Sequence, residues 1–468
     1  MSLKAASSLP ADLLTRVAVH HGCERVLEIG VQGGTQRVLR VGEEFGSQWL
    51  GGACPYQIPK SAAFDSSVLV VSEIALRALP GDIVRDAPIC IVTEDPRSGF
   101  DPALESSERL ASLQAVVQEM GLDPEFSGWA RSSSGPDLAV SLTRPGARRG
   151  PCEPTSGFRV LAVMTTYNEA DVIVPAVHAL LEQDIAVHLV DNWSTDGTPE
   201  LVKATFGERV KVEQFPSGGP TGFYQWGDQL DRVCEIANRS DASWTIHHDA
   251  DERRHGPWPD LNLRQALFKV DAEGCNAVNH TVIEFPPVDD GFEPGSDFER
   301  YFTRFSPAEA IANRIQIKAW KGRDVELRSS GGHEVVFANR RVHPFNFLLK
   351  HYPIRSQAHG ERKVLAERKP RITSQERGRW HTHYDHVRSG HVFLRNPSEL
   401  LTADEDFAER WLLERLYGFP VPGAGRLPVE VRRSMSEALR RAHLLKSARS
   451  FRRWYRLAFG RHPDSGRR

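Results

Sequence analysis

The feature that most constrains the fold is a repeated alternation of apolar strands and helices between residues 158 and 252. The strands that the sequence predicts in this stretch are 158–164, 186–190, 210–215 and 243–248. Segments with helical patterns, among them 170–183 and 225–237, separate these strands. Such a series is typical of an α/β protein with a parallel sheet between helices. In open sheets of this type, ligands bind at the carboxyl ends of the strands.

Polar loops follow three of these strands, at the edge where a ligand is expected. One loop spans Thr165 to Glu169, the second begins at Asp191, and the third contains Asp249 and Asp251. Side chains at positions i and i+2 of a strand point the same way, so Asp249 and Asp251 can face one site. Their hard carboxylate oxygens suit Mg²⁺ or Mn²⁺ bound to substrate phosphates. An isolated Asp-x-Asp pair is also common in solvated turns, so the argument depends on the three loops together.

The three loops resemble the motifs of the family 2 glycosyltransferases, which have the GT-A nucleotide-diphospho-sugar transferase fold. The resemblance is carried by 166–169 (Thr-Tyr-Asn-Glu), 191–198 (Asp-Asn-Trp-Ser-Thr-Asp-Gly-Thr) and 249–252 (Asp-Ala-Asp-Glu), and it covers residues 158–360. A further segment, 351–356, is similar to one found in a bacterial branch of these enzymes. The resemblance implies a UDP- or GDP-sugar donor, an Mn²⁺ or Mg²⁺ cofactor and inversion at the anomeric carbon.

The resemblance also implies roles for individual residues. The residues expected to bind the nucleotide sugar are Thr165, Thr166, Tyr167, Asn168, Glu169, Asp191, Asp249 and Arg355. The metal is expected on Asp249 and Asp251, with His351 or His333 as a further ligand from the C-terminal side of the site. For the loop residues the alternative is helix capping and turn formation, and for a single histidine it is a structural hydrogen bond.

A general base must remove the proton from the acceptor hydroxyl in a reaction of this kind. Glu334 is the favoured candidate, because a glycine pair shortly before it permits close approach of a ligand or loop. Glu284 and Asp290 are the alternatives. The planar fork of donors on Arg355 is suited to phosphate, and its alternative role is a surface ion pair.

The alternation of strand and helix patterns in residues 1–143 predicts a smaller Rossmann-like α/β domain with a parallel sheet. Residues 27–30 (Leu-Glu-Ile-Gly), followed by Gly34, resemble the first motif of S-adenosylmethionine-dependent methyltransferases. Gln32 replaces the middle glycine of that loop. The expected second strand, at 47–54, ends without the carboxylate that such domains use to hold ribose hydroxyls. These departures predict a degenerate methyltransferase-like domain that has lost its cofactor site.

The remaining boundaries follow from composition. A segment rich in proline, glycine and charge predicts a linker at 144–157, and 361–430 is expected to be a C-terminal extension. Residues 431–468 hold twelve Lys or Arg against Glu437 and Asp464, and they predict a basic amphipathic helical tail. This tail is expected either to contact an anionic membrane surface or to pack on the core with its basic face in solvent.

Composition argues against several other classes. The net charge of −2 gives no whole-chain argument for nucleic-acid binding, and six scattered cysteines fit reduced thiols. The N-terminus lacks the apolar core of a signal peptide, and we expect no membrane span. The sequence therefore predicts a cytoplasmic inverting glycosyltransferase, peripheral at the inner membrane face if its tail binds lipid, acting on a glycan or lipid-linked acceptor. The alternatives are an S-adenosylmethionine-dependent methyltransferase acting on a glycan and a non-catalytic scaffold.

Overall fold

The chain divides into two compact units, which are described separately. The first comprises Met1–Arg149 with Asp406–Arg468, and the second comprises Gly150–Glu405. The computed structural model describes residues 9–21, 23, 25–29, 36–40, 48–50, 67–72, 76, 84, 87–93, 106–130, 137–144, 153–305, 316–372, 386–403 and 412–417. Among these residues, no helix is long and apolar enough to cross a membrane.

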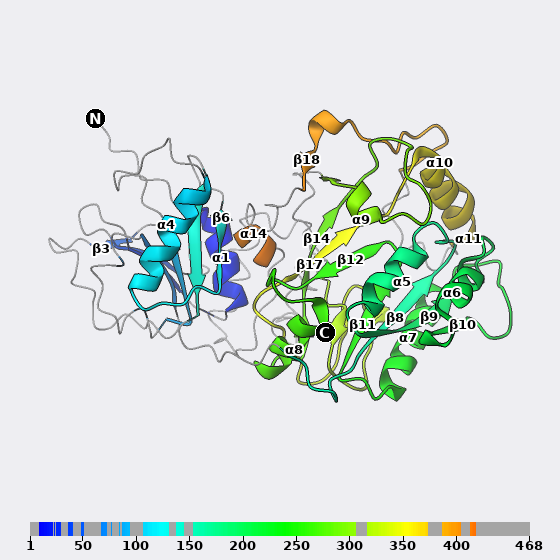
Figure 1. Ribbon diagram of the computed structural model, residues 1–468, viewed down its shortest axis with the longest axis horizontal. Coiled ribbons are helices and arrows are strands. Elements are labelled where there is room, and N and C mark those ends of the chain that lie inside the picture. Colours follow the sequence, from blue (N-terminus) through cyan, green and yellow to red (C-terminus); the bar gives the residue numbers. More distant parts are fainter. Residues whose placement is uncertain are drawn as a thin grey trace, which may run out of the picture. The chain divides into compact units, whose positions relative to one another are not determined.

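The first unit is built on a seven-stranded sheet in the order β3-β2-β1-β4-β5-β7-β6 (Figure 1). Its strands are β1 (Arg25–Ile29), β2 (Gln36–Arg40), β3 (Gln48–Leu50), β4 (Ser67–Ser72), β5 (Ile89–Thr93), β6 (Phe126–Ala130) and β7 (Leu138–Thr143). Its helices are α1 (Ala11–His20), α4 (Ser106–Glu119) and α14 (Leu412–Leu416). The chain therefore returns to this unit near its C-terminal end, where Arg16 donates a hydrogen bond to the carbonyl of Tyr417 at 3.1 Å.

The prediction of a parallel sheet in this unit is wrong at both edges. β4 pairs in parallel with β1 and β5, but β2 pairs with both β1 and β3 in the antiparallel sense, and β7 pairs with both β5 and β6 in the antiparallel sense. Only six residues connect β1 to β2, which is too short for the crossover helix that a parallel neighbour requires. The loop with Gly30, Gln32 and Gly34 lies outside the described residues, so the methyltransferase-like cofactor site stays a prediction.

Apolar residues of β4, β5 and α4 form the core of the first unit. Leu69 and Val71 from β4 and Cys90 from β5 are buried, and they belong to one cluster with Leu113 and Val117 of α4. Burial in this cluster raises the pKa of the Cys90 thiol to about 12. A thiol that stays protonated is a poor nucleophile, so Cys90 is a packing residue.

The second unit contains a six-stranded sheet in the order β10-β9-β8-β11-β16-β13. Its strands are β8 (Val160–Thr166), β9 (Ile185–Asp191), β10 (Val210–Gln214), β11 (Trp244–Asp249), β13 (Ala277–Val278) and β16 (Ala319–Trp320). The first four are parallel, and β16 is antiparallel to β11. The four strands predicted between residues 158 and 248 are thus present, and the α/β class is confirmed. The helices α5 (Ile173–Leu181), α6 (Thr198–Phe206) and α7 (Trp226–Arg239) connect them.

A second, smaller sheet continues from the end of β11. It has the order β12-β17-β14, with β12 at Glu252–His255, β14 at His280–Glu284 and β17 at Phe347–His351. The register places His351 directly opposite both Glu252 and Glu284. Residues opposite one another in a sheet have their side chains on the same face, so these three side chains lie on one face at one end of the small sheet.

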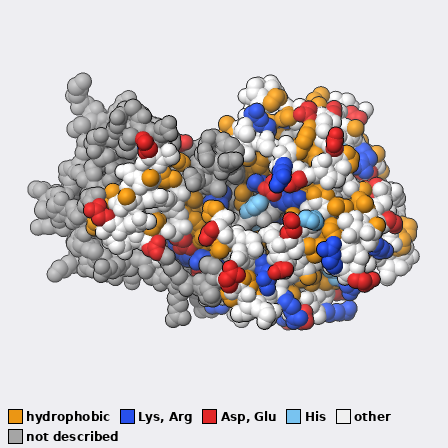
Figure 2. All heavy atoms as spheres, viewed as in Figure 1, with side chains coloured by type: hydrophobic (Ala, Val, Ile, Leu, Met, Phe, Trp, Pro, Cys, Tyr) orange, Lys and Arg blue, Asp and Glu red, His pale blue; other side chains and the backbone are white. Residues whose placement is uncertain are grey.

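The remaining elements of the second unit are short, with one exception. They are α8 (Leu263–Ala272), α9 (Phe298–Tyr301), β15 (Arg304–Phe305), α10 (Gln357–Gly360), α11 (Lys369–Arg371) and β18 (Leu401–Thr402). Between α10 and α11 the backbone forms a π-helix, η4 (Glu361–Arg368), a rare form that is frequent at functional sites. Figure 2 shows that basic and acidic side chains are interspersed on one face of this unit. The linker residues 145–152 and the whole tail, 431–468, lie outside the described residues.

Candidate functional site

The site lies where β8, β9 and β11 end side by side. In the register of the sheet, Thr165 of β8 stands beside Asp249 of β11, and Thr166 stands beside Asp191 of β9. The hydroxyl of Thr165 donates to Asp249 at 3.3 Å, and that of Thr166 donates to Asp191 at 3.3 Å. The sheet therefore brings together the three loops that the sequence singled out, although Asp249 is 58 positions beyond Asp191 in the chain.

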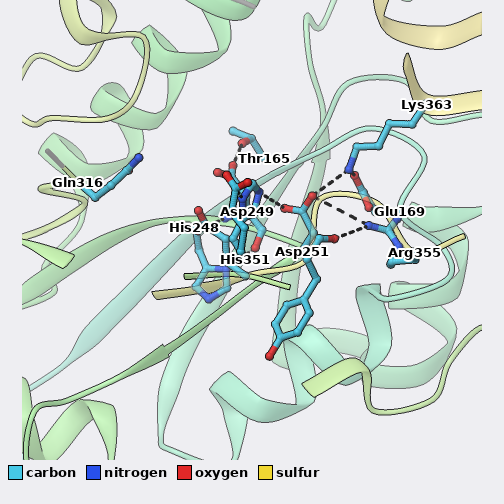
Figure 3. A network of polar contacts seen from close by, with 12 residues as sticks. Thr165, Glu169, His248, Asp249, Asp251, Gln316, His351, Arg355 and Lys363 are labelled. Carbon is cyan, nitrogen blue, oxygen red and sulfur yellow. Dashed lines mark hydrogen bonds and ion pairs between the residues drawn. The ribbon is translucent and has the colours of Figure 1, made fainter. Parts of the chain in front are cut away.

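The two carboxylates of the Asp-x-Asp pair meet two different lysines, Lys318 and Lys363, and Figure 3 shows Lys363 beside Asp251. The ammonium of Lys318 lies 2.7 Å from Oδ2 of Asp249 and 3.0 Å from Oε1 of Glu252. The ammonium of Lys363 lies 2.8 Å from Oδ2 of Asp251 and 2.9 Å from Oε1 of Glu169. Each aspartate is thus one half of a carboxylate–lysine–carboxylate bridge. The side chain of Asp251 is 8% exposed and that of Asp249 is 28% exposed, so Asp249 is the more accessible of the two.

These bridges keep both aspartates ionised. Burial alone would raise the pKa of Asp251, but Lys363, His351 and Arg355 together hold it well below its usual range. In the same way, burial opposes ionisation of Asp249, and Lys318 outweighs it and holds the pKa of that carboxyl well below normal. The lysines respond in turn, because the facing carboxylates overcome burial and raise the pKa of each ammonium. The site is a set of fixed charges at neutral pH.

A buried arginine anchors the first loop. Arg355 is 1% exposed, and its guanidinium donates to Asp171 at 2.6 and 2.9 Å and to Glu169 at 2.6 Å. Figure 3 shows Glu169, Arg355 and Lys363 gathered beside Asp251. The guanidinium N–H groups that were predicted to bind phosphate therefore donate to carboxylates of the protein. Arg355 is a positioning residue for the loop and not an exposed phosphate ligand.

Two sets of residues in the site carry donor atoms that could bind a metal ion. Among the described residues, the group of three with ligand atoms within 4.8 Å of one another is Glu169, Asp171 and His359. Arg355 occupies its centre, since its side chain binds both carboxylates and its backbone N–H donates to Nδ1 of His359 at 3.2 Å. At Asp249 and Asp251 the facing positions are taken by lysine ammoniums. Each lysine binds Oδ2 of its aspartate, Oδ1 of Asp249 accepts from Thr165, and Oδ1 of Asp251 lies 3.8 Å from His351. A divalent ion on either set would share its carboxylates with a bound cation, so neither set fits Mn²⁺ or Mg²⁺ as arranged.

The predicted third ligands of the metal behave differently from each other. Nε2 of His351 lies 3.8 Å from Asp251, and its Nδ1 lies 3.6 Å from Glu284. Burial would lower the pKa of His351, but its contact with Glu284 and the charges of Asp251 and Glu284 raise it above 6.5. His333 is exposed and contacts Gln316 at 3.0 Å, and Gln316 stands apart from the cluster in Figure 3. His351 is in the site, and His333 is not among the residues the structure gathers there.

Asp191 organises its own turn instead of facing outward. Its carboxylate is fully buried and accepts from the backbone N–H of Ser194 at 2.9 Å and from its hydroxyl at 2.5 Å. Burial raises its pKa, and these hydrogen bonds oppose that shift. The turn is then joined to the first loop, since the Asn168 side chain accepts from Thr195 N–H at 2.8 Å. Asp191 therefore holds the shape of its own turn, and its contact with the nucleotide base stays a prediction.

Aromatic and cationic groups that the sequence analysis missed lie beside Tyr167, which it predicted, at the same edge. The Arg371 guanidinium lies over the Tyr167 ring, 3.8 Å from its centroid, and 5.7 Å from that of Tyr224. Arg371 also donates to the Asn192 side chain at 2.7 Å. Tyr224 in turn stacks on Trp226 with ring centroids 5.6 Å apart. Flat groups of this kind suit a nucleoside base, because base–aromatic stacking is largely independent of base identity.

The predicted bases occupy contrasting environments. Glu334 is 3% exposed and bound to Arg340 at 2.9 Å, so its carboxylate is engaged in a buried ion pair. Asp290 is exposed and accepts the backbone N–H of Gln357 at 2.6 Å, which fixes the start of α10. Glu284 ends β14 with its side chain 27% exposed and lies beside His351. The preference for Glu334 is therefore not supported by its surroundings, and Glu284 is the carboxylate that the small sheet directs to the site.

Comparison with known proteins bears on the first three strands. Residues 161–227 match glycosyl transferase family 2. The matched segment contains the loops with Thr166, Asn168 and Asp191, and it ends before Asp249. This match supports the prediction of a glycosyltransferase over that segment of the chain. No curated protein is significantly similar to the chain.

Solved structures similar to the chain include the crystal structure of mannosyl-3-phosphoglycerate synthase from Rubrobacter xylanophilus. The two are 22% identical, with a TM-score of 0.20, and the similarity covers 31% of this chain. The chain spans 45% of the length of that protein. At this TM-score the likeness adds nothing to the assignment.

Proposed function

We propose that the second unit is an inverting glycosyltransferase that takes a sugar from a nucleoside diphosphate and passes it to a hydroxyl group. The observation that carries this proposal is the meeting of three polar loops at the ends of β8, β9 and β11, two of them within the segment that matches the family. Ligands of open α/β sheets bind at that edge. The carboxylates, lysines and aromatic groups found there supply the contacts that a nucleoside diphosphate needs.

Each part of the donor has a matching part of the site. The nucleoside base is placed against Tyr167, Tyr224 and Arg371, which offer flat faces and a cation. The diphosphate is placed over the bridges of Lys318 and Lys363, where positive charge is fixed. The sugar then lies toward the small sheet, at the end that carries Glu284. Negative charge grows on the leaving diphosphate as the bond to the sugar breaks, so fixed cations there stabilise the transition state.

Within this proposal Glu284 is the general base. Its carboxylate is partly exposed, and His351 beside it links it to Asp251. A base must come within hydrogen-bonding reach of the acceptor hydroxyl, and a buried carboxylate held by Arg340, as Glu334 is, cannot do so without releasing its partner. Inversion follows if the acceptor oxygen attacks the face of the sugar opposite the diphosphate.

The acceptor is proposed to be a glycan or a lipid-linked sugar. The basic tail, 431–468, would bring a cytoplasmic enzyme to the inner face of a membrane, where lipid-linked acceptors lie. This part of the proposal depends on the sequence pattern, because the tail lies outside the described residues. Sedimentation of the protein with anionic vesicles at low and high salt tests it, and absence of binding at low salt would contradict it.

The enzymatic proposal is tested with a panel of UDP- and GDP-sugars. The full chain should hydrolyse at least one of them slowly and transfer its sugar to an added acceptor. Glu284→Gln should lower kcat by roughly 100-fold or more and leave KM for the donor nearly unchanged, because a base acts on the acceptor proton. Glu334→Gln is the matched variant and should lower stability more than kcat. If Glu334→Gln abolishes turnover in folded protein and Glu284→Gln does not, the assignment of the base is wrong.

A further inference from the structure

We propose that Lys318 and Lys363 supply the positive charge for departure of the diphosphate, in place of a divalent metal ion. This inference rests on the glycosyltransferase function proposed above. It follows from the two carboxylate–lysine–carboxylate bridges, which occupy the positions where family 2 enzymes are expected to carry a metal. The argument depends on the geometry of each lysine, on the charge of the cluster and on the donors that remain.

Lys318 is built into the site. It is 3% exposed, it immediately precedes β16, and its backbone carbonyl accepts the N–H of His247 at 2.8 Å. Its ammonium has three donors, of which two go to Asp249 and Glu252. Among the described residues these are its side-chain partners, so one N–H remains. Asp249 is the most accessible acid of the cluster, with its side chain 28% exposed, so the exposed side of this bridge is at Asp249.

Lys363 mirrors this arrangement from the π-helix η4. It is 4% exposed, and two of its donors go to Asp251 and Glu169 at 2.8 and 2.9 Å. Burying a lysine is costly unless it is paired, and both pairs here are close and well directed. The third N–H of Lys363 has no partner among the described residues. Two separate segments, the residue before β16 and the π-helix η4, thus each place one ammonium on one aspartate of the pair.

The charges of the cluster are already nearly balanced. The acids of the cluster are Glu169, Asp251 and Glu252, which are buried, and Asp171 and Asp249, which are half-buried. The cations bound to them are Arg254, Lys318, Arg355 and Lys363. A divalent ion placed on Asp249 and Asp251 would stand next to two ammoniums, whose repulsion is strong where water is excluded. It would have to displace the lysines from carboxylates that hold them in place.

The lysines can perform the electrostatic part of the reaction. The bond between the anomeric carbon and the diphosphate oxygen breaks, and its electron pair leaves with the diphosphate. The acceptor oxygen forms the new bond to that carbon, and its proton passes to Glu284. The remaining N–H groups of Lys318 and Lys363 donate to the oxygens of the leaving diphosphate, where charge accumulates. No further reactant is needed, because the transfer consumes only donor and acceptor.

The experiment combines chelation, metal binding and substitution. After dialysis against EDTA, the wild-type chain should turn over its nucleotide sugar within about twofold of the rate with added Mn²⁺. Electron paramagnetic resonance should show that added Mn²⁺ stays free in the presence of the wild-type chain. Lys318→Met and Lys363→Met should each lower kcat by about 100-fold or more, as loss of one donor to a developing charge does. Each should also gain Mn²⁺ binding, because it frees two carboxylates.

Controls separate the explanations. Lys321→Met removes an exposed lysine that pairs with Asp271 at 2.7 Å, and it should change neither turnover nor metal binding. The wild-type measurements stand even if a lysine variant fails to fold. Turnover that disappears on chelation and returns with Mn²⁺ overturns the lysine proposal and leaves the glycosyltransferase function intact. If no nucleotide sugar is bound or turned over with or without Mn²⁺, the proposed function itself fails, and the inference fails with it.

Discussion

Replacement of Arg355 by methionine distinguishes the two roles that its position permits. The sequence pattern predicts a phosphate ligand, whereas the structure shows a guanidinium with three short bonds to Asp171 and Glu169. Methionine keeps most of the volume and removes the charge. The variant therefore leaves Glu169 and Asp171, with side chains 8% and 18% exposed, without their shared cation.

The expected loss of stability follows from that burial. Removing one partner of a buried ion pair costs roughly 3–5 kcal/mol, because the remaining charge stays desolvated. In a domain of this size each kcal/mol lowers Tm by about 2–4 °C, so the second unit should melt roughly 6–20 °C lower. Urea and thermal unfolding followed by tryptophan fluorescence and circular dichroism would measure the change. Nucleotide-sugar binding by Arg355→Met should weaken only at temperatures or urea concentrations at which the second unit is partly unfolded.

Arg300→Met is the matched control for this variant. Arg300 has an 89% exposed side chain and pairs with Asp297 at 3.5 Å, so its loss should cost about 0–1 kcal/mol. If Arg355→Met is as stable as Arg300→Met and has lost nucleotide-sugar binding selectively, Arg355 is a substrate ligand. That result would refute the structural role and restore the phosphate-binding prediction.

Two further predictions concern packing and protonation. Gly332 has φ +87°, and a Cβ there would lie 3.0–3.2 Å from Leu230, His247 and Trp226, so Gly332→Ala should lower the free energy of unfolding by about 1–3 kcal/mol or more. Gly295→Ala is the control, because Gly295 has φ +86° with open space around it and reports the backbone strain alone. Equal losses of unfolding free energy for the two variants in urea would contradict the packing argument. Burial lowers the pKa of His247 from 6.5 to about 4. Between these pH values the unfolded chain binds a proton at His247 and the folded chain does not, so the free energy of unfolding should fall by roughly 3 kcal/mol as pH drops from 6.5 to 4. His247→Gln should remove this part of the pH dependence of the unfolding free energy, and an unchanged slope would show that His247 does not cause it.

The strands of the second unit and their order in the chain were predictable from local pattern. Apolar residues at strand spacing, each run ending in a polar loop, identify β8, β9 and β11 without any tertiary information. The rule that parallel strands end at one edge then brings Thr165, Thr166 and Asp249 together. Even so, the sequence did not predict that Asp191 turns inward, because Ser194 satisfies it within its own loop.

The first unit shows where local pattern is not enough. β1, β4 and β5 are apolar runs of the kind that local pattern identifies as strands, and they pair in parallel. The position of β2 was missed, because polar residues such as Gln36 and Arg37 occupy a strand whose pairing depends on a neighbour. β3 lies within the strand expected at 47–54, but it pairs with β2 in the antiparallel sense. Strand preference reflects packing against neighbours more than an intrinsic backbone tendency.

The partners of the Asp-x-Asp pair were decided by tertiary structure alone. Lys318 is 69 positions from Asp249, and Lys363 is 112 positions from Asp251, on a segment that composition assigned to an extension beyond the catalytic domain. Two carboxylates one residue apart predict that a cation is needed, and hard-ion chemistry makes a metal the natural expectation. Nothing in the local pattern says whether that charge is a metal or a lysine. The answer depends on which distant elements the sheet brings within 3 Å, and burial then fixes both charges in place.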